Sequence, residues 1–139
     1  MTASSALDVL GSAKYISLTT YRKDGTAVAT PVWLVRRGDA LIVITDPNSG
    51  KAKRLRTNPA VLASPCDMRG RVKPGAVSAP GLVRMQDTVE TAASMDAITR
   101  KYGLMGRILT KMNERKARKA GTGDAGHLGL AITLTGAKS

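Results

Sequence analysis

A cluster of lysine and arginine residues follows a turn of small residues between Asn48 and Pro59, and this cluster is suited to binding an anion. Asn48 or Ser49 can cap a helix with its side-chain oxygen, and Pro59 disfavours helical backbone in the residue before it, so we expect a helix from about Gly50 to Thr57. Cations are locally unfavourable at a helix start, because free N–H groups and the helix dipole already make it positive. Residues that are unfavourable for local structure often mark a functional site. Free N–H groups beside lysine and arginine side chains favour the binding of a phosphate group.

Helical spacing predicts which side chains of this helix share a face. The inward face holds Ala52 and Leu55. The cations fall on two flanks, Lys51 with Arg54 and Lys53 with Arg56. The competing interpretation is a solvated basic face whose charge is compensated by Asp46, and charge and spacing alone leave both interpretations open.

The composition fits one intracellular domain over residues 1–139 with an anionic partner. The chain has 22 Lys and Arg against 10 acids, a formal charge of +12, which favours a charged cofactor, a nucleic acid or an anionic membrane surface. One cysteine allows no internal disulfide, which fits a reducing cytoplasm, and the N-terminus has no signal-peptide pattern. No apolar stretch approaches the ~20 residues of a membrane span. Scarce aromatic residues disfavour single-strand nucleic-acid platforms.

Period-two alternation and turn residues predict six strands around the basic helix. A helix from Ser4 or Ser5 to Ser12 precedes them, and Asp87 with Glu90 forms a capping box for a helix that ends at Gly103. A further helix is expected at 104–112, so that a helical insertion of about 87–118 precedes the last strand. The strands are expected at 14–21, 26–35, 40–45, 60–64, 76–85 (broken around Pro80 and Gly81) and 127–135. This order favours a mainly β fold, a six-stranded antiparallel β-barrel with peripheral helices.

Other candidate chemistry has simpler explanations. Residues 121–126 match a dinucleotide fingerprint by letters, but they follow a basic helix and precede a strand, which is the wrong context. His127 is the only histidine, so a histidine pair for a metal and a catalytic triad are both excluded. Cys66 has no identifiable base beside it and fits a structural thiol. An anion site without an acid, base, nucleophile or metal cluster indicates chemistry supplied by a bound organic cofactor.

Two sequence elements resemble one known family. These are Thr30-Pro31-Val32-Trp33 and, after Ile44-Thr45, the pattern Gly50-Lys51-x-x-Arg54-x-x-x-Asn58-Pro59. Together they resemble the pyridoxamine-phosphate-oxidase-like, flavin-reductase split β-barrel superfamily, and more narrowly its actinobacterial deazaflavin (coenzyme F-420)-dependent oxidoreductases. The extra C-terminal substrate-phosphate motif of true pyridoxamine-phosphate oxidases has no match before Ser139, so we do not expect that activity.

The resemblance implies a homodimeric split barrel with cofactor sites at the subunit interface. The strand at Thr30, Pro31, Val32 and Trp33 would line an isoalloxazine-like ring, with backbone groups near Pro31 meeting its polar edge. The phosphate would be held by Thr45, Ser49, Gly50 and Lys51, helped by Arg54 or Arg56. Pro31 by itself predicts an edge strand, because proline cannot donate to a ladder.

These observations lead to one main hypothesis and several alternatives. The main hypothesis is an F-420-dependent oxidoreductase that transfers a hydride between the deazaflavin and a conjugated acceptor, because a strongly basic chain suits that coenzyme's phosphodiester and oligoglutamate tail. The family also binds FMN and heme, so an FMN-dependent oxidoreductase and a carrier without turnover remain alternatives. A basic nucleic-acid-binding β-barrel is a third. The residues identify neither a catalytic acid or base nor the acceptor.

Overall fold

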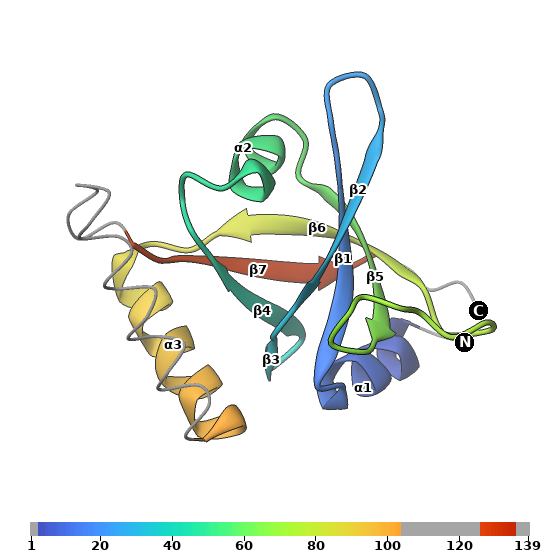
Figure 1. The fold of residues 1–139 in the computed structure, drawn as a ribbon. Coiled ribbons are helices and arrows are strands. Elements are labelled where there is room, and N and C mark those ends of the chain that lie inside the picture. Colours follow the sequence, from blue (N-terminus) through green and yellow to red (C-terminus); the bar gives the residue numbers. More distant parts are fainter. Residues whose placement is uncertain (1–2, 104–125, 136–139) are drawn as a thin grey trace.

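The computed structural model describes residues 3–103 and 126–135 as one curled sheet with three helices in that part of the chain (Figure 1). The expected helix at 104–112 and nearly all of the glycine-containing segment at 121–126 lie outside these residues. The elements in chain order are α1 (Ala3–Ser12), β1 (Tyr15–Tyr21), β2 (Ala27–Val32), β3 (Val35–Arg37), β4 (Ala40–Thr45), α2 (Gly50–Thr57), β5 (Ala60–Cys66), β6 (Ala79–Met85), α3 (Thr88–Tyr102) and β7 (Leu128–Leu134).

The sheet has seven antiparallel strands in the order β2-β1-β5-β6-β7-β4-β3, so the prediction of six strands was wrong. The expected strand at 26–35 is two strands, because the chain leaves β1 after Val32 and pairs again with β4 from Val35. Leu34, between them, is fully buried. Since β2 and β3 are consecutive in the chain yet stand at opposite ends of the sheet, the sheet curls until its two ends approach, as in a split barrel.

Alternation along the strands places the core on the concave face of the sheet. Leu18, Leu41, Val43 and Leu130 are fully buried there, and α1 adds Leu10. Each is a residue that its strand or helix turns inward, which is the periodic pattern that builds one core. The expected strand at Ala40–Thr45, buried on both faces, is confirmed.

The sixth strand is continuous, although a break was expected around Pro80 and Gly81. Pro80 pairs with Leu62, and Gly81 lies between Val61 and Leu134. A Cβ on Gly81 would lie 2.9 Å from the carbonyl oxygen of Thr133, so the strands approach too closely there for any larger residue. The glycine therefore permits pairing rather than ending it.

Helix α3 covers the outer face of the sheet near β7 and β4. Its capping box is confirmed, since Asp87 accepts from the backbone of Glu90 and Glu90 accepts from the backbone of Asp87. Its polar inner side is hydrogen-bonded: Ser94 donates to Gln86, and Thr91 accepts from the N–H of Gly129. In the described residues, no helix is long and apolar enough to cross a membrane.

Candidate functional site

Helix α2 begins and ends where its capping residues predict. Ser49 is the N-cap, with extended backbone and a side-chain oxygen that accepts from the N–H of Ala52 at 3.1 Å. The same oxygen lies 3.1 Å from the hydroxyl of Thr45, the last residue of β4. Of the two caps considered, the structure therefore has Ser49. Its hydroxyl joins the end of a strand to the start of the basic helix.

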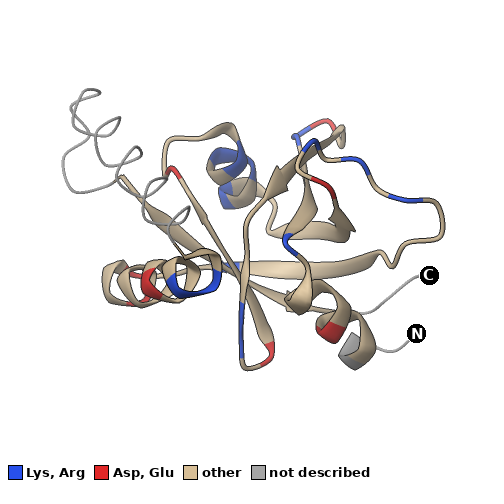
Figure 2. Ribbon diagram, turned by 60° about the horizontal axis from the view of Figure 1, so that its bottom comes forward, with Lys and Arg blue, Asp and Glu red and all other residues tan. Residues whose placement is uncertain are grey.

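The two flanks of α2 have different surroundings. Ala52 and Leu55 are buried, as predicted, and Figure 2 shows Lys and Arg along this helix with no acid among them. Lys51 and Arg54 are half-buried, whereas Lys53 and Arg56 are exposed. Only the first flank therefore faces the body of the protein.

Arg54 is anchored across the start of its own helix. Its Nε donates to the hydroxyl of Thr20, in β1, at 2.7 Å. A Cβ built on Gly50 would lie 2.9 Å from Nη1 of Arg54, so the guanidinium lies over the first helical residue. Thr20 is itself fully buried. Glycine at position 50 thus leaves room for the arginine head.

Lys51 completes a positive corner at this helix start. Burial, and then the nearby charge of Arg54, lower the pKa of Lys51 from its ordinary value. Among the described residues, no ion pair involves Lys51 or Arg54, and Asp46 accepts instead from the backbone N–H of Asn48. The proposed compensation by Asp46 is thus not seen. Two half-buried cations beside free N–H groups form the arrangement that binds a phosphate or carboxylate.

Arg56 does not join this corner. Its Nη2 donates to the carbonyl of Pro47 at 2.9 Å, on the exposed flank of α2. Of the two arginines expected to assist the phosphate site, the structure therefore brings Arg54 together with Thr45, Ser49, Gly50 and Lys51.

The second group of predicted residues lies on the edge strand β2. This strand pairs only with β1, so Pro31 is at a sheet edge, as predicted. The hydroxyl of Thr30 is buried and has no hydrogen-bond partner in the described part of the chain. Because an unpartnered buried hydroxyl is costly, Thr30 is a candidate for contact with a polar ligand group.

Strand β1 connects the two groups. In β1, Thr20 accepts a hydrogen bond from Arg54 and pairs with Val28 of β2. Leu18, two residues earlier on the same face of β1, pairs with Thr30. Thr30 therefore lies two residues along β2 from the residue that pairs with Thr20. Thr20 was not singled out as a site residue. The sequence did contain a signal for Thr20: it carries a hydroxyl group on the face of the strand where Ile16 and Leu18 are apolar.

Trp33 follows β2 and is largely engaged by protein contacts. Its ring stacks on that of Tyr102 with centroids 4.2 Å apart, and Tyr15 lies at a tilt 6.5 Å away. Val32, the residue before it, packs against the core. The structure therefore places Trp33 as a support for the end of the edge strand. Tyr102 was not predicted from the sequence, since nothing local relates it to a residue 69 positions earlier.

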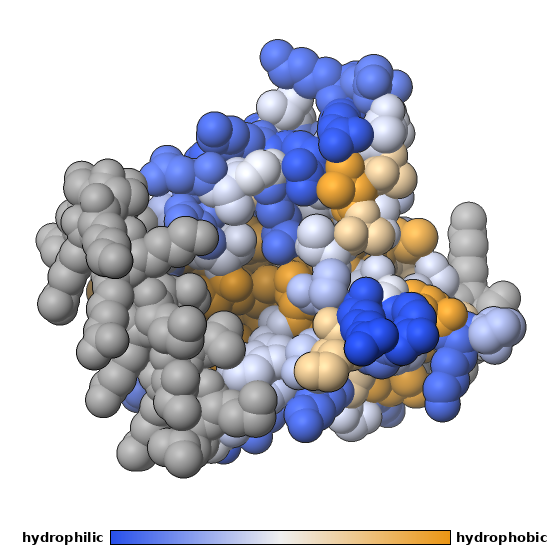
Figure 3. Space-filling view, viewed as in Figure 1, coloured by the Kyte–Doolittle hydropathy of each residue, from blue (hydrophilic) through white to orange (hydrophobic). Residues whose placement is uncertain are grey.

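The surface next to α2 combines charge with a hydrophobic hollow. In Figure 3 a hydrophobic depression lies directly below the hydrophilic side chains around that helix. A positive corner beside apolar surface suits a ligand with an anionic group and a planar organic part. The described residues contain no group of three or more His, Cys, Asp or Glu that could hold a metal ion.

Solved structures with the same architecture share little sequence with this chain. An F420 reductase is 18% identical, with a TM-score of 0.63 and coverage of 94% of both chains. HutZ, a heme storage protein from Vibrio cholerae, is 12% identical, with a TM-score of 0.67 and coverage of 99% of this chain and 94% of that one. An FAD-binding protein from Mesorhizobium loti is 17% identical, with a TM-score of 0.57 and coverage of 100% and 96%. At these identities the likeness shows the fold alone.

Sequence comparison identifies the family. Curated protein sequences give no match. The family model described as pyridoxamine 5'-phosphate oxidase matches residues 4–125, which includes the edge strand and the whole of α2. The chain therefore belongs to the pyridoxamine 5'-phosphate oxidase family, whose split-barrel fold it has.

Proposed function

We propose that this protein is an F-420-dependent oxidoreductase that transfers a hydride between the deazaflavin coenzyme and a conjugated organic acceptor. The observation that supports it best is the corner where half-buried Lys51 and Arg54, without an acidic partner in the described residues, flank the N-terminus of α2. The family, and the fold shared with an F420 reductase, favour a redox coenzyme as the anion's source.

The residues of this chain would bind and orient that coenzyme. Lys51, Arg54 and the hydroxyls of Thr45 and Ser49 would hold its phosphate, and Thr30 would meet a polar group of the ring. When bound, reduced coenzyme F-420 supplies the hydride, so the protein's contribution is alignment and exclusion of water. We expect a homodimer with the coenzyme at the interface, to be tested by analytical ultracentrifugation.

The formal charge of +12 favours F-420 over FMN. The deazaflavin's phosphodiester and oligoglutamate tail add negative charges that FMN lacks, and a basic surface attracts them. The exposed cations Arg56 on α2 and Arg69 between β5 and β6 supply additional positive charge at the surface of the protein.

The identity of the coenzyme is tested by purification from a host that makes both flavins and deazaflavins. We expect the absorption spectrum of the retained molecule to be that of F-420. Retention of FMN alone would replace the deazaflavin assignment with the flavin one, and a colourless protein that binds neither on titration would refute both.

The site assignment is tested with a pair of lysine variants. Lys51→Ala should weaken coenzyme binding by about 1.5–3 kcal/mol, the usual cost of a lost hydrogen bond to a charged group. Lys53→Ala, on the exposed flank of the same helix, is the matched control and should bind nearly as well as the wild type. Fluorescence titration measures both, and equal losses in the two variants would indicate a diffuse charge effect rather than a site.

A carrier without turnover is the second candidate, favoured by the structural likeness to a heme storage protein. Stopped-flow reoxidation of reduced F-420 by quinones, enones and tetrapyrroles separates the two functions. Acceptor-dependent reoxidation supports the oxidoreductase. Tight binding without reoxidation by any acceptor supports the carrier.

A further inference from the structure

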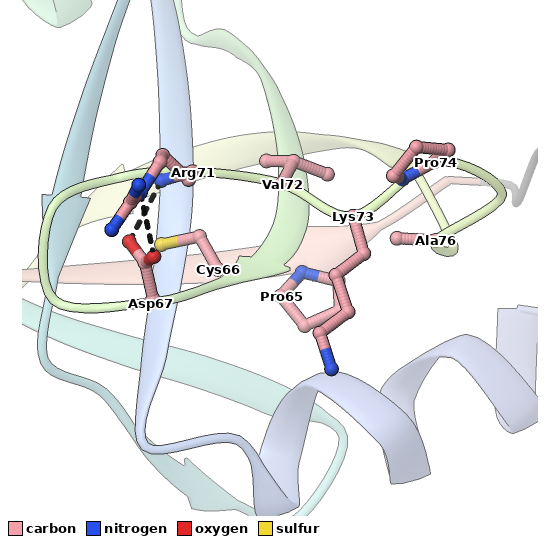
Figure 4. Close-up of a pocket in the computed structure, with 8 residues that line it drawn as sticks. All are labelled: Pro65, Cys66, Asp67, Arg71, Val72, Lys73, Pro74 and Ala76. Carbon is pink, nitrogen blue, oxygen red and sulfur yellow. Dashed lines mark hydrogen bonds and ion pairs between the residues drawn. The ribbon is translucent and has the colours of Figure 1, made fainter.

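A second concave site lies at the end of β5, beneath the loop that connects β5 to β6 (Figure 4). Its volume is about 540 Å³, within the range of small-molecule sites. Most of its walls are apolar, formed by Pro65, Val72, Pro74 and Ala76. The side chains of Cys66, Asp67, Arg71 and Lys73 supply its polar atoms.

The loop over this pocket is fixed by Asp67. One carboxylate oxygen accepts from the backbone N–H groups of Arg69 and Arg71, each at 2.9 Å, and the other accepts from Nε of Arg71 at 3.0 Å. Gly70 allows the turn, with φ of +85°, and lies beside Pro31 of the edge strand, because a Cβ added to Gly70 would lie 3.4 Å from Cδ of Pro31. The pocket wall is therefore preformed, which lowers the entropic cost of binding a ligand.

The same ion pair decides the charge of the pocket. Asp67 offsets the positive charge of Arg71, whereas the ammonium group of Lys73 makes no hydrogen bond or ion pair with the described residues. Figure 4 shows the side chain of Lys73 extending past Pro65, away from the ion pair. Cys66 adds no negative charge at neutral pH, because burial raises the pKa of its thiol. The pocket thus presents apolar walls and one uncompensated ammonium group.

This pocket is separate from the positive corner of α2. Cys66 pairs with Tyr15 at the start of β1, whereas Arg54 is anchored on Thr20 near the other end of the strand. Five residues of strand span roughly 17 Å at about 3.3 Å per residue. A ligand here therefore need not displace a phosphate held by Lys51.

We propose that the pocket between β5 and the β5–β6 loop binds an elongated apolar monocarboxylate, with Lys73 as the partner of its carboxylate. A single ammonium group matches one negative charge, and the apolar walls match a hydrocarbon or ring body. A phosphate dianion carries two negative charges, of which this one uncompensated cation would offset only one. The proposal does not depend on coenzyme binding.

The experiment uses Cys66, the chain's only cysteine, as a reporter inside the pocket. The rate of its modification by N-ethylmaleimide, followed by mass spectrometry, is measured in the presence of octanoate, octanol or octyltrimethylammonium. We expect octanoate to protect the thiol at concentrations at least tenfold lower than the other two. Equal protection by all three probes, or none by any, would overturn the proposal.

Matched lysine variants assign the charge. Lys73→Met keeps the length and apolar stem of the side chain, and it should abolish the advantage of octanoate over octanol. Lys53→Met, on the exposed flank of α2, should leave that advantage unchanged. Circular dichroism of each variant verifies folding, and calorimetric titration with octanoate gives a second readout for the same comparison. Octanoate protection that survives in Lys73→Met would remove Lys73 from the site.

Discussion

The rings of Trp33 and Tyr102 are stacked, with centroids 4.2 Å apart and planes 2° from parallel. Trp33 follows the edge strand β2, and Tyr102 is the last residue of α3. The Tyr102 hydroxyl lies 2.7 Å from the carbonyl of Lys14 and 3.1 Å from that of Leu34, and it accepts from the N–H of Leu34. The end of α3 therefore fixes the crossover from β2 to β3, and with it the end of the strand that holds Thr30.

Removing only the hydroxyl of Tyr102 should destabilise this crossover. Tyr102→Phe retains the stacked ring but leaves the N–H of Leu34 without its partner, and we expect a loss of about 1–3 kcal/mol in the free energy of unfolding. Urea unfolding followed by the fluorescence of the single tryptophan measures it. Tyr21→Phe is the control, since the hydroxyl of Tyr21 makes no hydrogen bond to the described residues, and an equal loss there would contradict the role given to Tyr102.

The lowered pKa of Lys51 predicts a pH dependence of stability. In the interval between that lowered value and the ordinary value of 10.5, the unfolded chain holds the proton that the folded chain has released, so stability rises with pH there. Below the interval, charged Lys51 costs folding energy because it is buried. Lys51→Met should therefore be more stable than the wild type at pH 7, and the difference should shrink toward pH 10.5.

Urea unfolding of the wild type and Lys51→Met over pH 7–10.5 tests this sign, with the exposed Lys53→Met as reference. A Lys51→Met variant that is less stable than the Lys53→Met variant at neutral pH would show that Lys51 stabilises the fold. The interpretation that Lys51 is kept for function, despite a cost in folding stability, would then lose its support.

A methyl group at Gly50 should separate folding from anion binding. The Cβ would lie 2.9 Å from Nη1 of Arg54, so the guanidinium must move away from the helix start. Alanine favours a helix by up to about 1 kcal/mol relative to glycine, whereas the displaced guanidinium gives up its bond to the buried hydroxyl of Thr20. These opposing effects should leave the stability of Gly50→Ala close to that of the wild type. Its affinity for inorganic phosphate should nevertheless fall several-fold, by calorimetry. Thr57→Ala, at the other end of α2, should leave the affinity unchanged.

Local chemistry explains which elements could be predicted. The bounds of α2 follow from the Ser49 cap and from Pro59, and the capping box follows from the spacing of Asp87 and Glu90, so both were predicted correctly. The hairpin of β1 and β2 likewise follows from its turn, where Asp24 accepts from the N–H of Thr26. All these interactions join residues close in sequence.

Contacts between distant residues explain what could not be predicted. The division of residues 26–35 into β2 and β3 depends on the burial of Leu34 and on pairing with β4, and an apolar run does not indicate where such a break falls. The bonds of Arg54 to Thr20 and of Tyr102 to Leu34 join residues 34 and 68 positions apart. The bounds of the basic helix α2 could thus be predicted from the sequence, but the residues that position its side chains could not.

The ion pair of Glu90 with Arg84 predicts a loss of stability in acid. The two guanidinium contacts, at 3.0 and 2.7 Å, and then the N–H of Asp87 lower the pKa of Glu90 from 4.5 to about 2. The contribution of this carboxylate is therefore complete above pH 4.5 and disappears as the pH falls toward about 2. Glu90→Gln should melt at a lower temperature than the wild type at pH 6, and the two melting temperatures should converge toward pH 2. Asp96→Asn is the control, because Asp96 is exposed on α3 and its carboxylate makes no hydrogen bond to the described residues. A Glu90→Gln difference that is independent of pH would assign the effect to packing instead.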